Sequence, residues 1–134
     1  MNSEKVSVNI NNDKLAKIDL LVSEGFYSNR STFINEAVSQ LLEEKGDLID
    51  TIIAESNKVY STNSWFIGAQ NLSREYLEDY RDHGVKFSLK GFGVLYIDSD
   101  VSPELLSDTV TYISDKILVR GSKEVLEYVK TIRG

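Results

Sequence analysis

The chain has 134 residues, which suffices for one ordinary domain or for a very small domain joined to a modest second one. Its hydrophobic content of 41% can form a packed core, and its longest apolar runs are too short to span a bilayer. The formal net charge of −6 argues against generic affinity for nucleic acid, which depends mainly on basic side chains.

The lack of cysteine limits the chemistry that the chain can perform. There is no cysteine and one histidine, His83, so disulfides, thiolate zinc sites and cysteine nucleophiles are excluded. We expect no metal, no cofactor and no catalytic residue, because no group of side chains has the spacing of a catalytic or metal-binding motif. Residues 1–6 are polar and hold no signal-peptide core, which predicts a cytoplasmic protein without a membrane segment.

The first pattern in the chain is a strict alternation over residues 5–10. One face of this segment is apolar and holds Val6, Val8 and Ile10, and the opposite face holds Lys5, Ser7 and Asn9. A period of two residues predicts a β-strand. Because a lone strand cannot satisfy its backbone groups, its partner must come from the C-terminal region or from a second copy of the chain.

Two helices are predicted after this strand. Asn11, Asn12 and Asp13 are capping residues, and a helical apolar pattern follows until Gly25, a natural stop. Ser28 is the expected cap of a second helix. The side chains of Phe26 and Tyr27, in the connection, are expected to be buried in the core between the two helices. The second helix presents an apolar face made of Phe33, Ile34, Ala37, Val38, Leu41 and Leu42. So small a unit needs a partner, and two copies that pair their strands would share one core.

Residues 47–134 predict a second domain that contains both helices and strands. Strands are expected at residues 58–67, 85–89, 92–97 and 117–119, with Lys90-Gly91 as a turn. Helices are expected at residues 47–57, 72–83, 102–113 and after Gly121. The predicted order β-α-β-β-α-β with an added helix suits a ferredoxin-like α+β sheet.

Residues 5–45 resemble the ribbon-helix-helix family of transcriptional regulators, the class of the MetJ and Arc repressors. The resemblance rests on the order of the parts: the ribbon Lys5–Ile10, a first helix over residues 11–24, the turn Gly25-Phe26-Tyr27 and the helix start Ser28-Asn29-Arg30-Ser31. It implies an intertwined dimer in which domain 1–46 places an antiparallel two-stranded ribbon in the major groove of double-stranded DNA.

The resemblance also implies roles for particular residues. Lys5, Ser7 and Asn9 would read base edges, for which their donors and acceptors are suited. Ser28, Asn29, Arg30 and Ser31 would hold a DNA phosphate at a helix N-terminus. Without the two helices that follow, the polar face of Lys5, Ser7 and Asn9 would be interpreted as the solvated face of an ordinary edge strand. Ser28 would likewise be interpreted only as a helix cap.

We therefore expect a sequence-specific regulator, a repressor and not an enzyme, that acts as a homodimer or a higher homo-oligomer. Domain 47–134 would serve oligomerisation, effector binding or partner binding. Nickel-responsive repressors have a similar domain order, but they bind nickel through several histidines and a cysteine, so nickel sensing is rejected for this chain.

The charge distribution keeps a second hypothesis open. Residues 1–46 contain five basic side chains, Lys5, Lys14, Lys17, Arg30 and Lys45, against seven acidic ones. An antitoxin-like or scaffolding protein would use the ribbon for dimerisation and residues 47–134 to bind a protein partner. A positive ribbon face on the dimer would favour the regulator over this alternative.

Overall fold

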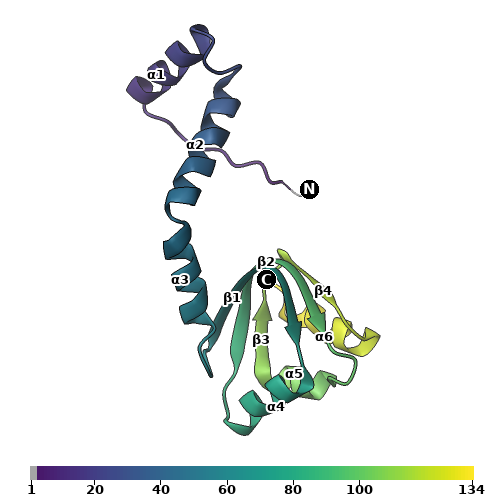
Figure 1. Cartoon of the computed structure of the whole chain (residues 1–134). Coiled ribbons are helices and arrows are strands. Elements are labelled where there is room, and N and C mark those ends of the chain that lie inside the picture. The colour runs from purple at the N-terminus through teal and green to yellow at the C-terminus, as the bar shows by residue number, and fades with distance from the viewer. Residues whose placement is uncertain (1–2) are drawn as a thin grey trace. The chain divides into compact units, whose positions relative to one another are not determined.

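The computed structural model describes residues 3–134, so the first two residues of the predicted domain 1–46 lie outside the described part of the chain. The chain divides into two compact units, of which the first ends at Asp47 and the second comprises Leu48–Gly134. Helices and a four-stranded sheet make up the described residues, as Figure 1 shows. No helix within residues 3–134 has both the length and the apolar character needed to cross a bilayer.

The first unit contains helices α1 (Asn12–Ser23) and α2 (Arg30–Glu44). The side chain of Asn11 caps α1 by accepting a 2.8 Å hydrogen bond from the backbone N–H of Asp13, which confirms the predicted start. At the other end Gly25, at φ +82°, donates to the Val22 carbonyl, and Phe26 donates to the Leu21 carbonyl. This pair of hydrogen bonds is a Schellman motif, and it turns the chain away from α1 at the predicted stop.

The second unit alternates strands and helices. Helix α3 (Gly46–Ser56) belongs to this unit from Leu48 onwards. It is followed by β1 (Asn63–Leu72), α4 (Arg74–Asp82), β2 (Phe87–Ile97), α5 (Pro103–Thr109), β3 (Val110–Ile113), β4 (Ile117–Arg120) and α6 (Lys123–Ile132).

The sheet is parallel, and β2 is its central strand. Strand β1 pairs with β2 along its whole length, from Asn63 opposite Ser88 to Leu72 opposite Ile97. The other edge of β2 is shared, with β3 beside its first residues and β4 beside Gly93–Tyr96. Since the Ser114 N–H still donates to the Leu89 carbonyl between them, β3 and β4 behave as one strand interrupted by a bulge.

The ferredoxin-like expectation is wrong, because that fold needs a hairpin of two strands where this chain has the single strand β2. Gly91, expected from the sequence to lie in a turn, and Gly93 both lie inside β2, at φ +125° and +139°. A Cβ on Gly91 would lie 1.8 Å from the Phe66 carbonyl oxygen of β1. The two glycines therefore permit a close approach of the paired backbones rather than a chain reversal.

Two further boundaries differ from the sequence-based expectation. The helix expected over residues 102–113 ends at Thr109, and Val110–Ile113 forms β3. This segment reads Val-Thr-Tyr-Ile, whose β-branched and aromatic side chains favour a strand over a helix. The first strand begins at Asn63 and not near residue 58, and it extends to Leu72, which was expected to begin a helix.

The core of the second unit lies between the sheet and three helices. Buried side chains of all four strands form one cluster with those of α4, α5 and α6, so the three helices cover the same face of the sheet. The cluster includes the largest fully buried side chains, Phe87, Leu72, Leu77, Leu95, Leu106, Ile113 and Ile117. The opposite face of the sheet exposes Trp65, Ile67, Phe92, Tyr96 and Leu118.

Candidate nucleic-acid interface

Residues 3–11 run extended ahead of α1 and pair with no strand among the described residues of the chain. The side chains of Lys5, Ser7 and Asn9 are exposed. The alternate residues are apolar and equally uncovered, since Val6 and Val8 are 73% and 68% exposed. Residues 5–10 therefore combine an exposed apolar face with backbone groups that no strand in the described part of the chain pairs.

An apolar groove lies between α1 and α2. It is lined by Ile10 at the end of the extended segment, by residues of α1 and by residues of α2, namely Lys14, Lys17, Ile18, Leu21, Phe33, Ile34, Ala37, Val38 and Leu41. Ile18 is the one buried hydrophobic residue found in residues 3–47, and Val38 and Leu41 are about half exposed. The apolar side chains of α1 and α2 that line this groove are therefore largely accessible to solvent in the single chain.

Asp19 and Arg30 fasten the two helices to each other. The Arg30 guanidinium donates from Nε and Nη2 to the two Asp19 carboxylate oxygens, at 2.7 and 2.9 Å. This two-point contact holds the pKa of Asp19 below its ordinary value. Because the guanidinium is engaged in this way, Arg30 orients the start of α2.

The N-terminus of α2 is capped by Asn29 rather than by Ser28. The Asn29 carboxamide oxygen accepts from the backbone N–H of Thr32 at 2.8 Å, whereas the Ser28 hydroxyl lies 3.1 Å from the Thr32 hydroxyl. Asn29 takes this position because its backbone is extended and it directly precedes the first helical residue. The N–H groups of Arg30 and Ser31, in the first turn, have no acceptor within the helix.

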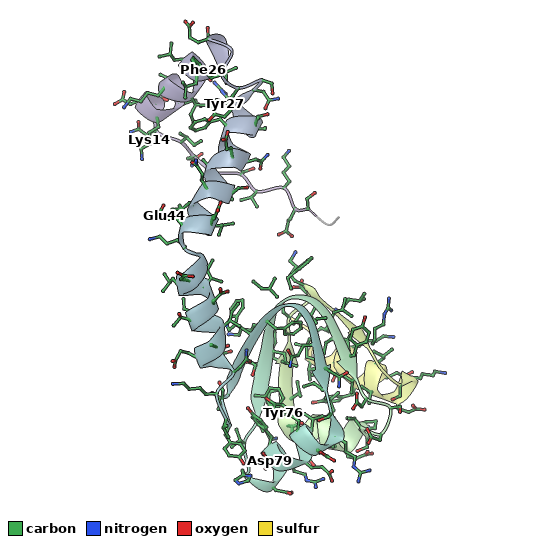
Figure 2. All side chains as sticks on the ribbon, in the orientation of Figure 1. Lys14, Phe26, Tyr27, Glu44, Tyr76 and Asp79 are labelled. Carbon is green, nitrogen blue, oxygen red and sulfur yellow. The ribbon has the colours of Figure 1, made fainter. Side chains whose placement is uncertain are left out.

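The two aromatic residues in the connection between α1 and α2, Phe26 and Tyr27, lie in different environments. Tyr27 packs edge-on against Phe33, with ring centroids 5.1 Å apart, and its hydrogen bond with Glu36 raises its pKa. Phe26 is 73% exposed, so the expectation that both residues plug the core is wrong for Phe26. Figure 2 shows the two side chains at the turn between α1 and α2.

A scan against protein-family models matches residues 1–126 to the ribbon-helix-helix transcriptional regulator family. The chain belongs to this family. The match extends well beyond the N-terminal third on which the sequence resemblance rested, and includes most of the second unit. No curated protein and no solved structure matches the chain.

Family membership supports DNA binding and a role in transcription regulation, and it indicates a protein that is not an enzyme. The structure brings Ser28, Asn29, Arg30 and Ser31 together at one helix start, while Lys5, Ser7 and Asn9 lie along the separate extended segment.

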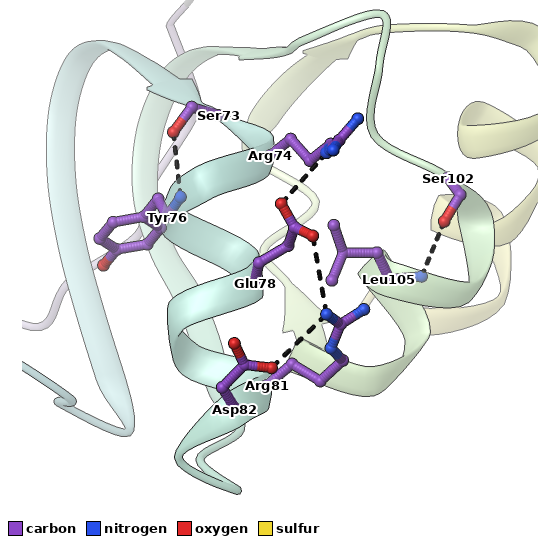
Figure 3. Close-up of polar contacts among 8 residues, drawn as sticks. All are labelled: Ser73, Arg74, Tyr76, Glu78, Arg81, Asp82, Ser102 and Leu105. Atoms are coloured by element: carbon purple, nitrogen blue, oxygen red, sulfur yellow. Dashed lines mark hydrogen bonds and ion pairs between the residues drawn. The ribbon is translucent and has the colours of Figure 1, made fainter.

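Several polar side chains of α4 and at the start of α5 bind one another or cap a helix. On α4, Glu78 accepts from Arg74 at 3.1 Å and lies 3.6 Å from Arg81, which also contacts Asp82, as Figure 3 shows. Ser73 and Ser102 cap α4 and α5 by accepting from the N–H groups of Tyr76 and Leu105. Helix capping and surface ion pairs therefore explain these polar side chains of α4 and of the start of α5.

His83 closes α4, as its position before Gly84 predicts. It is the C-cap residue, its Nδ1 lies 2.8 Å from the Asp79 carbonyl oxygen, and its ring stacks on Tyr60 at 4.3 Å. Within residues 3–134 no three carboxylate or imidazole groups gather as a metal site would require. The contacts of His83 are those of a structural residue.

Proposed function

We propose that this ribbon-helix-helix protein is a sequence-specific repressor that binds double-stranded DNA as a dimer. The observation that carries the proposal is the extended segment of residues 5–10, which pairs with no strand among the described residues and precedes two helices with an open apolar groove. Two such segments, one from each copy, would form an antiparallel ribbon in which the facing edge of each strand is hydrogen-bonded to the other.

Dimerisation follows from the distribution of apolar surface in the first unit. Pairing two copies through residues 5–10 places Val6 and Val8 between them and brings two grooves together over one shared core. Burial of a single large aliphatic side chain contributes about 1.5–3 kcal/mol. Val6, Val8, Val38 and Leu41, all at least half exposed in one chain, supply that stabilisation only in the dimer.

The polar face of the ribbon then points away from the shared core, toward the DNA. Because residues alternate along a strand, burying Val6 and Val8 leaves Lys5, Ser7 and Asn9 on the opposite face. A lysine ammonium donates to guanine acceptors, a carboxamide bonds adenine with both of its groups, and a serine hydroxyl adapts to either. These three side chains are the proposed base readers.

The start of α2 is the proposed phosphate clamp. The backbone N–H groups of Arg30 and Ser31 and the positive end of the helix dipole attract an anion without a net positive charge on the protein. The Ser28 and Ser31 hydroxyls add donors, and Asn29 shapes the helix start. Arg30 contributes by its contact with Asp19, which fixes where the helix start points. Such a clamp lets an acidic protein bind a polyanion.

The proposal is tested by selecting DNA from a random pool with the purified full chain. We expect enrichment of an inverted or tandem repeat, because two symmetric half-ribbons read two half-sites. The matched control is the chain with Lys5, Ser7 and Asn9 all replaced by alanine, which keeps the apolar face. Failure of the wild type to enrich any sequence, or an equal enrichment by the control, would contradict base reading by the ribbon.

The acidic character of the chain favours one alternative, a protein that dimerises through the ribbon and binds a protein partner through residues 47–134. The formal charge of −6 is the observation behind it. The same selection separates the two functions, since the alternative predicts no enriched sequence, and a partner encoded nearby would then co-purify with the chain.

A further inference from the structure

We propose that the outer edge of strand β1 pairs in an antiparallel direction with the same edge of a second copy of the chain. The residues that would pair are Ile67, Ala69 and Asn71, which we call the free edge of β1. The pairing would join two four-stranded sheets into one sheet. The inference rests on the proposed function, because the dimer made by the ribbon supplies the second copy at a high local concentration.

Along β1, the backbone N–H and C=O groups point alternately toward β2 and away from it. Just before the strand, the Thr62 carbonyl accepts a 3.0 Å hydrogen bond from the Ser88 N–H of β2. At the end of the strand, the Leu72 carbonyl accepts one of 3.1 Å from the Asp98 N–H. Even-numbered residues therefore turn their backbone groups toward β2, and odd-numbered residues turn theirs toward the outer edge.

The end of α3 closes the first part of this outer edge. The Trp65 N–H donates to the Ser56 hydroxyl at 3.1 Å, and the Asn57 carboxamide donates to the Trp65 carbonyl at 2.9 Å. Both backbone groups of this odd-numbered residue thus bind side chains outside the sheet, as the direction of the even-numbered residues requires. The outer edge of β1 is therefore covered as far as Trp65.

Beyond Trp65 the outer edge is bare. The N–H and C=O groups of Ile67, Ala69 and Asn71 point outward, and no strand within residues 3–134 pairs with them. Residues 67–71 are all exposed, and the strand ends at Leu72. Unpaired backbone groups on a sheet edge form a template for another strand. The free edge therefore offers a short stretch of β1 for pairing.

The opposite edge of the sheet is protected in ways that β1 is not. Strands β3 and β4 are only four residues long, Ile113 of β3 bridges to Arg133, and β4 ends at the charged Arg120. Shortness, charge and cover are the devices by which proteins prevent sheet edges from pairing. Strand β1 has ten residues, Asn63–Leu72, without a charge or a proline. Its free edge therefore lacks the devices that would keep another strand away.

The hydrogen-bonding groups of the free edge are complementary to themselves. Facing residues of an antiparallel pair exchange two hydrogen bonds at every second position. If Ala69 faces Ala69 of the second copy, then Ile67 faces Asn71 and Asn71 faces Ile67. Every outward N–H and C=O group of the free edge is then bonded, whereas a shift by two residues leaves groups of each chain unbonded. A two-fold axis at Ala69 closes the contact, so no third chain adds to it.

The side chains of residues 67–71 permit this close pairing. The sequence Ile-Gly-Ala-Gln-Asn contains no charge, so no like charges face each other across the axis. Lys90 is the register partner of Trp65 and therefore lies outside the paired stretch. A strand of another protein could use the same edge, but symmetry would not fix its register. A second copy must place Ala69 opposite itself, and this register can be measured.

Disulfide formation in single-cysteine chains measures the register, because the natural chain has no cysteine. In a full-length Ala69→Cys chain, the two Cα atoms would lie about 5.5 Å apart, a distance that a disulfide bridges. Ile67→Cys is the matched control, since it is exposed on the same edge but lies about 14 Å from its counterpart. Under mild oxidation, we expect Ala69→Cys to form the interchain disulfide at least about tenfold faster than Ile67→Cys.

Amide hydrogen exchange gives a second readout that needs no cysteine. In a single chain the outward N–H groups of Ile67 and Asn71 exchange as exposed amides do, whereas the paired edge protects them. Ala69→Lys would place two like charges opposite each other at the axis, and it should speed the exchange of both amides by at least about tenfold. The amide of Leu95, a buried residue of β2, reports whether the variant is folded.

Faster disulfide formation by Ala69→Cys, together with protected amides of Ile67 and Asn71 in the wild type, supports the pairing. Equal disulfide rates overturn it, and so do unprotected amides in the wild type. Protected amides with equal disulfide rates would mean that a different strand covers the edge. The proposed function is judged separately, because it stands if the wild type selects a DNA sequence and fails if the wild type selects none.

Discussion

Asn9 is the side chain on the polar face of the extended segment that can specify a base by itself. Its carboxamide offers one donor and one acceptor, the pair that adenine presents in the major groove. Asn9→Ala is expected to weaken cognate binding by about 1–3 kcal/mol and to relax specificity at one position in each half-site. Fluorescence anisotropy with the selected DNA and single-base variants measures both effects.

Asn35→Ala is the matched control for this prediction. Asn35 is an exposed asparagine on α2, in the same unit but outside the proposed contacts. Its replacement should leave affinity unchanged. If a folded Asn9→Ala protein bound the cognate DNA as tightly as the Asn35→Ala protein, Asn9 would not be a base reader.

The ion pair between Asp19 and Arg30 predicts a pH dependence. Arg30 lowers the pKa of Asp19 from 3.8, so the stabilisation is complete above that value and is lost as the pH falls through the lowered pKa. Both groups are exposed, so the effect is small and is screened by salt. Chemical unfolding between about pH 2 and 6 should show a steeper acid loss in the wild type than in Asp19→Asn.

Asp50→Asn provides the comparison, since Asp50 is an exposed helical aspartate of α3. That variant should retain the acid dependence of the wild type. An acid dependence of Asp19→Asn equal to that of the wild type would show that the pair contributes nothing to stability in solution.

Among the elements, β2 depends most on single residues. Alanine at Gly91 would place a Cβ 1.8 Å from the Phe66 carbonyl oxygen, at a φ of +125° that alanine avoids. Strain of this kind costs of order 1–3 kcal/mol before the clash is counted, so we expect Gly91→Ala to destabilise the second unit by at least about 3 kcal/mol. Denaturant unfolding followed by Trp65 fluorescence measures it.

Gly46 provides the contrasting glycine. It begins α3 with open space at its Cβ position, so Gly46→Ala should leave stability unchanged or raise it by up to about 1 kcal/mol. Equal effects of the two substitutions would mean that the close approach of β1 and β2 does not constrain Gly91.

Local signals made both boundaries of α1 predictable, whereas the start of α2 was predicted one residue early, at Ser28 instead of Asn29. The cap at Asn11 and the stop at Gly25 each depend on hydrogen bonds to residues at most five positions away, and both are confirmed. The contact between Asp19 and Arg30 spans eleven residues, and no local pattern indicates it. The sequence therefore offers Arg30 as one of four phosphate-binding residues but does not reveal that its guanidinium binds the Asp19 carboxylate.

The second unit shows where local signals fail. Lys90-Gly91 has the composition of a turn, and only the neighbouring strand β1 reveals that Gly91 is needed for close packing. The segment Val110–Ile113 continues a helical apolar spacing, yet its pairing with β2 makes it a strand. For Gly91 the deciding contact is with a distant strand, which a short window of sequence does not contain. For Val110–Ile113 the local composition favoured a strand, but the helical apolar spacing of the preceding residues masked that signal.

At the scale of the whole molecule, the two units differ in whether a single chain forms their hydrophobic core. The second unit has a continuous core made by four strands and three helices, whereas Ile18 is the one buried hydrophobic residue found in residues 3–47. The first unit should therefore gain its stability from a second copy, as in obligate dimers.

This difference predicts that helix content and thermal stability depend on protein concentration. The midpoint of helix loss, followed by circular dichroism, should rise as the chain concentration is raised, because unfolding is coupled to dissociation. Ala37→Asp, which places a charge in the groove between α1 and α2, should lower helix content and reduce the mass to that of a smaller assembly in light scattering. A midpoint independent of concentration would indicate a first unit that is stable alone.

The most direct test of the central claim, that residues 5–10 of two copies pair as a ribbon, is amide hydrogen exchange of the full chain without DNA. One chain offers these amides no partner strand among its described residues. The account predicts that alternate amides in this segment, those that face the partner strand, exchange slowly where the chain is dimeric and that this protection is lost on dilution. Exchange at the rate of a free peptide in a sample shown to be dimeric would contradict the ribbon, and with it the proposed reading of DNA.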